Sequence, residues 1–218
     1  MFPIGDQNRR SAPFPYVNLT LIALNALVFL YMLTLNQEEL IAFVMNYGTI
    51  PALVTSGQRL GTLLTALFIH GGWLHILGNM IFLWVFGDNI EAALGHVTYA
   101  IFYLLAGVFA SLAHILFNLN STVPSIGASG AIAGVLGAYV ILYPMREVRV
   151  LIFAVVARVS AVVFLGVWAL LQLLNGLASL GVQTAETGGV AVWAHVGGFT
   201  IGALVGIVAH RAHRERRG

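Results

Sequence analysis

The sequence predicts an all-α membrane protein with six transmembrane helices. Of its 218 residues, 59% are hydrophobic and only 8% are charged, whereas soluble proteins carry about 25% charged residues. The 10 basic and 8 acidic side chains are too few to cover a water-facing surface. A membrane helix needs roughly 20 apolar residues. The chain has apolar runs near this length at 16–35, 63–86, 95–117, 129–143, 159–177 and 190–209.

The arginine positions predict that both chain ends lie in the cytoplasm. The first apolar run has no small-residue cleavage site, so we expect a retained anchor, not a signal peptide. Cationic loops stay on the cytoplasmic side, and only Arg59 falls opposite. We expect cytoplasmic tails at 1–15 and 211–218 and a six-helix domain at 16–210, in a multi-pass protein of the cytoplasmic membrane. The cytoplasmic arginines are Arg9, Arg10, Arg146, Arg149, Arg211, Arg214, Arg216 and Arg217.

Composition narrows the possible chemistry. The chain has no cysteine, which excludes disulfides, thiolate nucleophiles and cysteine-bound metals. Its net charge is only +2, and the arginines lie in terminal clusters and short loops, so no nucleic-acid partner is expected. Any reaction must use serine, histidine, asparagine or acids. The segment 36–62 is long enough for a structured outer loop.

Conspicuous polar residues lie near the outer ends of the second, fourth and sixth runs. The second carries His70, His75 and Asn79, the fourth begins at Ser129, and the sixth carries His195. His75 and Asn79 are four residues apart and therefore share one helical face. Polar groups at membrane depth are rare and usually functional. We expect a shallow site below the outer membrane surface.

The fourth run is unusually short. From Ser129 to Tyr143 it covers about 22 Å, less than the roughly 30 Å of the hydrocarbon core. The preceding segment 118–128 is polar and contains Pro124, which predicts irregular backbone. Such backbone is tolerated at this depth only inside protein or beside water. The sequence therefore predicts a water-accessible cavity above Ser129.

Ridges of small residues predict close packing between the fourth and sixth helices. Ser129 precedes its ridge by one residue and His195 follows a ridge residue by one, so each is turned about 100° from the contact line, in opposite senses. In parallel helices that face each other, both side chains then point to the same side. The ridges consist of Gly130, Gly134 and Ala138, and of Ala194, Gly198, Gly202 and Gly206.

These groups suit acyl transfer. A neutral imidazole can take the proton of a serine hydroxyl and make it a nucleophile, so we expect a dyad of Ser129 and His195. The two ridge-bearing helices have no Asp or Glu near His195. The free N–H groups at a helix N-terminus favour negative charge near Ser129. His75 and Asn79 can donate further hydrogen bonds to the developing oxyanion.

Three motifs, taken together and in order, resemble those of the rhomboid family of intramembrane serine proteases. They are Gly127-Ala128-Ser129-Gly130, the series His70, His75 and Asn79, and Ala194-His195-Val196-Gly197-Gly198. The resemblance covers nearly the whole chain. It implies a six-helix rhomboid-like bundle, an endopeptidase that cleaves transmembrane segments of membrane-protein substrates in the lipid bilayer, and no cofactor or metal.

Residue by residue, the resemblance implies that Ser129 is the nucleophile, His195 the general base, and His75 and Asn79 the oxyanion-hole side chains. It implies supporting roles for His70, Gly127 and Gly130, and helix packing for Gly134, Gly198 and Gly202. Two features depart from the family pattern. Many members have a Trp-Arg pair where this chain has Gly61 and Thr62, and some have an aromatic residue where it has Ala133. Support for the His195 ring must then come from elsewhere.

Other interpretations remain open on the sequence alone. Taken singly, Ser129 would be a helix-capping serine and Asn79 a link between helices. The chain could also be a rhomboid-like pseudoprotease that binds transmembrane clients, although neither the serine nor the histidine is lost. A His-rich metal or haem protein is a third alternative, but it leaves the depth of Ser129 unexplained. The sequence does not determine the oligomeric state or the natural substrate.

Overall fold

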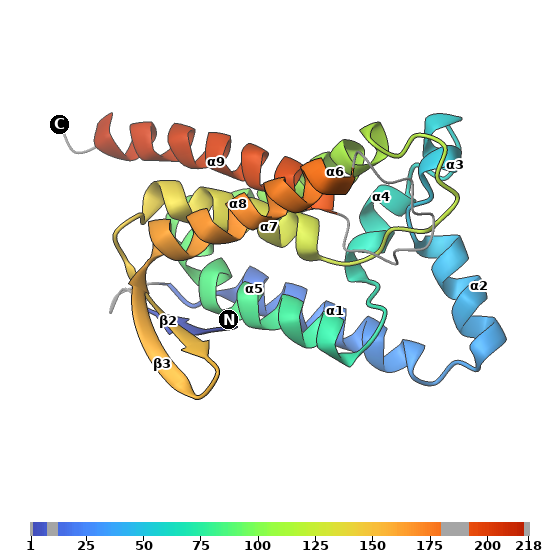
Figure 1. The fold of residues 1–218 in the computed structure, drawn as a ribbon, viewed down its shortest axis with the longest axis horizontal. Coiled ribbons are helices and arrows are strands. Elements are labelled where there is room, and N and C mark those ends of the chain that lie inside the picture. Colours follow the sequence, from blue (N-terminus) through green and yellow to red (C-terminus); the bar gives the residue numbers. More distant parts are fainter. Residues whose placement is uncertain (1, 8–12, 180–191, 216–218) are drawn as a thin grey trace.

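The computed structural model is a bundle of helices with a small antiparallel sheet at one end (Figure 1). It describes residues 2–7, 13–179 and 192–215. The longer helices are α1 (Tyr16–Met32), α5 (Trp73–Leu94), α6 (His96–Leu116), α7 (Ser129–Leu142), α8 (Ala161–Ser179) and α9 (Val192–Glu215). Between α1 and α5 lie α2 (Gln37–Tyr47), α3 (Pro51–Thr55), α4 (Thr62–Thr65) and the 3₁₀ helix η1 (Ala66–Phe68). The strands are β1 (Phe2–Asp6), β2 (Glu147–Ile152) and β3 (Val155–Ser160).

Three of the described helices are long and apolar enough to cross a membrane, namely α6, α8 and α9 as far as Ala212. A fourth candidate is the pair formed by Thr62–Phe68 and α5, which is bent by 96°. The helices α1 and α7 are apolar but shorter, with 17 and 14 residues. Every predicted apolar run thus coincides with a helix over most of its length, while the number of full crossings stays a prediction.

The second apolar run is not one continuous helix, as the sequence pattern suggested. The chain leaves the helical conformation after Phe68 and resumes it at Trp73, because Gly71 and Gly72 are poor helix formers. The helix α5 then extends to Leu94, beyond the predicted end at residue 86. Its last turns remain helical because polar residues there are buried against neighbouring segments.

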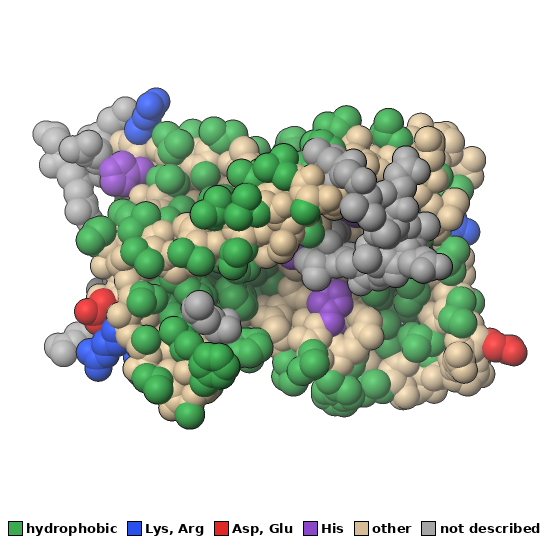
Figure 2. All heavy atoms as spheres, viewed as in Figure 1, with side chains coloured by type: hydrophobic (Ala, Val, Ile, Leu, Met, Phe, Trp, Pro, Cys, Tyr) green, Lys and Arg blue, Asp and Glu red, His purple; other side chains and the backbone are tan. Residues whose placement is uncertain are grey.

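Charged side chains lie at two ends of the molecule on the face shown in Figure 2, with hydrophobic side chains between them. Arg59 lies at the end formed by α2 to α4. Arg146, Arg149 and Arg158 lie in or beside the sheet at the opposite end. This separation follows the arginine asymmetry of the sequence. Four further arginines in that pattern, Arg9, Arg10, Arg216 and Arg217, lie outside the described residues.

The helix α7 is the buried centre of the bundle, and its residues 130–139 are all buried. The helix α9 packs on it through glycine. A Cβ atom added to Gly198 or to Gly202 would overlap the carbonyl oxygen of Gly130 or of Gly134, respectively. On its other side α7 meets α6, where a Cβ on Gly130 would lie 2.6 Å from the Cβ of Ala110. The two small-residue ridges are therefore in direct backbone contact.

A buried carboxylate connects α5 to the start of α1. Glu91 is 1% exposed, and its two oxygens accept hydrogen bonds from the backbone N–H groups of Val17 at 2.9 Å and Asn18 at 2.7 Å. The residue before α1, Pro15, provides no side-chain cap. Glu91 therefore supplies the negative group that the N-terminus of this helix requires.

The three-stranded sheet was not predicted from the sequence. Its order is β1-β2-β3, and both pairs are antiparallel. Residues 2–6, which the sequence analysis places in an N-terminal tail, form the edge strand β1. Val148 and Val150 alternate with exposed residues and are fully buried, a period-two pattern too short to stand out between two apolar runs.

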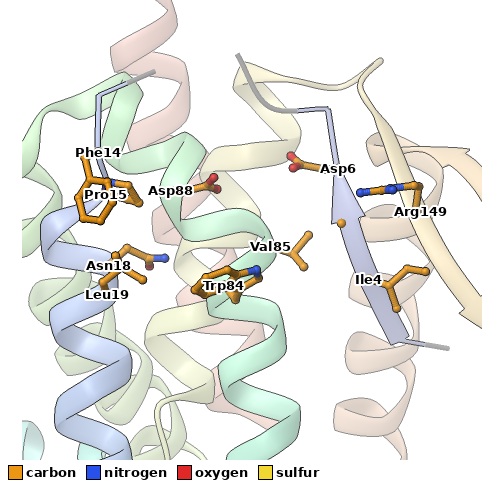
Figure 3. A pocket seen from close by; sticks show the side chains of 11 residues that line it. Ile4, Asp6, Phe14, Pro15, Asn18, Leu19, Trp84, Val85, Asp88 and Arg149 are labelled. Carbon is orange, nitrogen blue, oxygen red and sulfur yellow. The ribbon is translucent and has the colours of Figure 1, made fainter. Parts of the chain in front are cut away.

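A cavity of about 270 Å³ lies where α1, α5 and β1 meet. Figure 3 shows the carboxylates of Asp6 and Asp88 pointing toward each other across it. Asp6 accepts hydrogen bonds from the hydroxyl of Tyr139 and from the side-chain amide of Asn89, the latter at 3.0 Å. These bonds hold the edge strand against α5 and α7.

Replacing Asp6 by asparagine should raise the melting temperature at neutral pH. Burial raises the pKa of the Asp6 carboxyl above its ordinary value, although the Tyr139 hydrogen bond and the charge of Arg146 act the other way. A carboxyl whose folded-state pKa is raised stabilises the fold most below its unfolded-state pKa and loses that stabilisation as the pH rises through the folded value. Asparagine keeps an acceptor without a charge. Thermal unfolding of both proteins in detergent, at about pH 4 and about pH 8, should show an advantage for the variant at the higher pH only.

Asp6→Ala, which removes the acceptor, is the control and should melt below the wild type at both pH values. A lower melting temperature of Asp6→Asn near pH 8 would contradict this reading of the cluster.

Candidate active site

Ser129 is the first residue of α7 and is half-buried. The N-cap position belongs to Ala128, and no side chain caps this helix. Ser129 is therefore not the capping serine that the isolated sequence would allow. The N–H groups of the first turn have no partner within a helix and remain available to bind negative charge.

The segment before Ser129 is irregular, as predicted, and is fixed by backbone hydrogen bonds. Thr49 and Ser125 form an antiparallel bridge with N–O distances of 3.0 and 2.8 Å. The N–H of Gly127 donates to the carbonyl of Ala66 at 2.9 Å. Thr49 and η1 thus hold the backbone immediately ahead of the serine.

The segment 59–65 is held by hydrogen bonds to the end of α2. Arg59 donates from Nη1 to the carbonyl of Met45 at 2.7 Å, and the hydroxyl of Thr65 donates to the carbonyl of Tyr47 at 2.7 Å. These contacts fasten the loop in a chain that lacks the Trp-Arg pair.

Ser129 lines a small cavity of about 20 Å³, which is on the order of the space one or two water molecules need. Residues of η1, α6 and the preceding segment complete its wall, together with Ala194 of α9. A Cβ added to Gly130 would lie 3.6 Å from the Cβ of Ala194. Gly130, which follows the serine, therefore packs against Ala194, which precedes His195.

His195 lies in the first turn of α9 and is 6% exposed. Its Nδ1 lies 2.9 Å from Oε1 of Gln172. The ring of Trp168 lies against the imidazole, with centroids 5.7 Å apart. The Nε2 atom is buried and has no hydrogen-bond partner among the described residues, so the bond from Ser129 to this nitrogen is not formed in this structure.

The aromatic residue that some family members carry in place of Ala133 has no room here. Ala133 is fully buried, and a Cβ on Gly198 would lie 3.3 Å from its Cβ. Trp168 and Gln172 of α8 contact the His195 ring instead. Sequence analysis missed both residues. The available signal was an amide inside the apolar run 159–177, one turn after a tryptophan, because polar groups in such runs are uncommon.

His75 and Asn79 lie on one face of α5, as their spacing predicts. The N–H of Gly71 donates to Nδ1 of His75 at 3.3 Å. A neutral imidazole carries one proton, so in His75 the proton is on Nε2. A Cβ added to Gly127 would lie 2.7 Å from this nitrogen, which directs the N–H donor of His75 at the backbone just ahead of the serine.

The side chain of Asn79 is buried and donates one hydrogen bond to the carbonyl of His75 at 2.9 Å. An amide nitrogen has two hydrogens, so one donor remains for a further partner. His70 is 1% exposed, and its ring packs edge-on against that of His75 with centroids 4.9 Å apart. Its observed contact supports the His75 ring. Within the described part of the chain, no three His, Asp or Glu side chains are grouped so that they could hold a metal ion.

For the acyl-transfer chemistry that the sequence predicts, Gly127→Ala should lower kcat/KM by about 100-fold or more. Gly127 has φ +120°, which side chains rarely adopt, and the new methyl group would displace His75. Loss of one oxyanion donor typically costs on the order of 10²–10³ in rate. Gly57→Ala is the matched control, since Gly57 also has positive φ but an open surrounding. Equal activity of the Gly127 variant and the control would show that His75 is not displaced or not needed.

The comparisons with known proteins agree on one family. The family model of the Rhomboid domain matches residues 57–212. The chain is 36% identical over 129 residues to Rhomboid protease GluP of Bacillus subtilis, covering 57% of this chain and 24% of that protein. It is 30% identical over 158 residues to Rhomboid protein 1, mitochondrial, of Saccharomyces cerevisiae, covering 69% and 42%. It is 29% identical over 157 residues to RHOMBOID-like protein 1 of Arabidopsis thaliana, covering 72% and 36%.

The chain spans less than half the length of each of these relatives. The domain match nevertheless covers most of the chain and includes every residue of the candidate site. The apolar helices of the structure agree with this assignment. The chain is an integral membrane protein and belongs to the rhomboid family.

Proposed function

We propose that this protein is an intramembrane serine endopeptidase that cleaves transmembrane segments of other membrane proteins. One observation carries the proposal: the Nε2 atom of His195 is buried and has no hydrogen-bond partner among the residues that the structure describes. His195 follows Ala194, which lines the same cavity as Ser129. A histidine held in this way is a general base that lacks only its proton donor. Membership of a family that includes named proteases supports the same reaction class.

In the first step, Oγ of Ser129 attacks the scissile carbonyl carbon while its proton passes to Nε2 of His195. Hydrogen bonds of this kind are often long in the absence of substrate and shorten in the reacting complex. The carbonyl oxygen becomes an oxyanion, stabilised by the N–H of Ser129, by Nε2–H of His75 and by the remaining amide hydrogen of Asn79.

In the second step, the tetrahedral intermediate collapses. The bond from carbon to the peptide nitrogen breaks, and protonated His195 donates its proton to the leaving amine. A water molecule then attacks the acyl-enzyme, with His195 again accepting the proton. Collapse of this second intermediate breaks the ester bond, releases a carboxylic acid and restores the hydroxyl of Ser129. The reaction balances without a cofactor.

The substrate must expose a backbone carbonyl to Ser129. A transmembrane helix engages its carbonyls in hydrogen bonds within the helix, so the helix must unwind locally before attack. Glycine and proline reduce helix stability by about 1 and 3 kcal/mol per residue, and we propose substrates with such residues near the cut.

We also propose that both termini face the cytoplasm. The arginine-bearing sheet, which contains β1, then lies on the cytoplasmic side, and α7 begins at the opposite end of the bundle.

Fluorophosphonate labelling tests this proposal, because the reagent phosphonylates only a serine that a base has activated. The wild-type chain, purified in detergent, should be labelled, while Ser129→Ala should not be labelled and His195→Ala only weakly. Ser121→Ala, which alters another serine of the loop before α7, is the matched control and should be labelled fully. Equal labelling of all four proteins would refute the dyad. An unlabelled wild type that retains transmembrane clients would favour the pseudoprotease alternative.

A further inference from the structure

Among the described residues, the imidazole of His195 makes its one side-chain hydrogen bond to a residue outside the two helices that carry the dyad. Among the described residues, its partner is Gln172 of α8, with 2.9 Å between Nδ1 and Oε1. Trp168 lies one turn earlier on the same helix and packs against the ring at a centroid distance of 5.7 Å. One face of α8 therefore holds the His195 ring in two ways, by a hydrogen bond at Nδ1 and by packing of the Trp168 ring.

The direction of this hydrogen bond determines which ring nitrogen can act as a base. An amide oxygen can only accept, so Nδ1 of His195 carries the proton and donates it to Oε1 of Gln172. A neutral imidazole has a single N–H, which leaves Nε2 with a free lone pair. Nε2 is also the nitrogen for which the described part of the chain offers no hydrogen-bond partner. The contact with Gln172 therefore selects the tautomer that can accept the proton of Ser129.

We propose that Gln172 is a positioning residue that orients His195 and fixes its tautomer, the role that a carboxylate has in a serine protease triad. This inference rests on the proposed function. A neutral amide is suited to this depth, because an ionised carboxylate away from water is costly. It also explains how the base is supported in a chain that has Ala133 where some relatives have an aromatic residue.

Two variants of Gln172 test the role by kinetics with the chain in lipid vesicles and a transmembrane substrate. Gln172→Leu keeps the size but removes the acceptor, and should lower kcat about 10- to 100-fold with little change in KM. Gln172→Glu keeps an oxygen that can accept the hydrogen bond from Nδ1, and should therefore restore much of the kcat that Gln172→Leu loses. The titratable groups that act on His195, His75 of α5 and His114 of α6, are unchanged in both variants.

Asn175→Leu is the matched control, since it removes an exposed amide from the same helix and should leave kcat and the pH profile unchanged. A purely structural role for Gln172 would not make kcat depend on whether the replacement keeps an acceptor oxygen. Unchanged kcat in Gln172→Leu, or a kcat of Gln172→Glu no higher than that of Gln172→Leu, would overturn the inference.

A measurement on the wild type does not depend on whether a variant folds. Nitrogen-15 NMR of the histidine-labelled chain, with His195→Ala used to assign the signal, should show the proton on Nδ1. A proton on Nε2 would overturn the inference. Loss of labelling in Ser129→Ala together with unaffected kinetics in Gln172→Leu would refute the positioning role alone, whereas full labelling of Ser129→Ala would refute the proposed function itself.

Discussion

Replacing Ser129 by alanine should reduce cleavage of a transmembrane substrate by at least about 10⁴-fold, to the background of the assay. The variant has no oxygen nucleophile, and the remaining oxyanion donors cannot form an acyl-enzyme. In serine proteases, removal of a member of the catalytic set leaves only the 10³–10⁴-fold acceleration over water that arises from binding and the oxyanion hole. His195→Ala should cause a loss of similar size, because the two residues act as one unit.

The assay should use the chain in lipid vesicles with a fluorescently labelled transmembrane peptide, and should follow product formation by gel or mass spectrometry. The double variant should be no slower than either single variant, since the effects of groups that act as a unit are not additive. Both variants should unfold at the temperature of the wild type within a few degrees. Residual cleavage at more than about 1% of the wild-type rate in Ser129→Ala would identify another nucleophile.

Replacing Gly202 by alanine should destabilise the fold by about 3 kcal/mol or more and lower the melting temperature by about 10 °C. The added methyl group would overlap the carbonyl oxygen of Gly134, so α7 and α9 would have to separate. Backbone cannot relieve such an overlap as a flexible side chain would. Gly202 lies two turns beyond His195, and separation of the helices there should also lower cleavage by moving the base from the serine.

Gly166→Ala is the matched control for this variant. Gly166 lies within α8, and a Cβ there meets no atom within 4 Å, so alanine should be neutral or stabilise the helix by up to about 1 kcal/mol. Thermal unfolding in detergent and the cleavage rate should be measured on both proteins. A melting temperature of Gly202→Ala equal to that of the control would show that the two helices do not pack as closely as described.

Local patterns were sufficient for much of the site. The apolar runs predicted the helices. The ridges on 130–138 and 194–206 predicted which two helices touch, because small residues at helical spacing let membrane helices pack closely. The spacing of His75 and Asn79 predicted a shared face. These features follow from helical periodicity, which depends only on residues a few positions apart. The motifs also predicted the rhomboid family, which the comparisons confirm.

Other features depend on segments that the chain brings together from far apart, and no local pattern specifies them. The sheet pairs β1 with residues that follow it by more than 140 positions. The partner of His195 comes from α8, 23 positions earlier in the chain.

The sequence by itself therefore determined the side chains available to the proposed site, namely a hydroxyl, three imidazoles and an amide, and the two helices that carry Ser129 and His195. The tertiary structure decided how each group is held. Ala128, not Ser129, occupies the N-cap of α7, and Gln172 contacts Nδ1 of His195. His75 directs its N–H toward Gly127. The physical reason is that residue type fixes what a side chain can donate or accept. The direction of each hydrogen bond depends on atoms that distant segments place beside it.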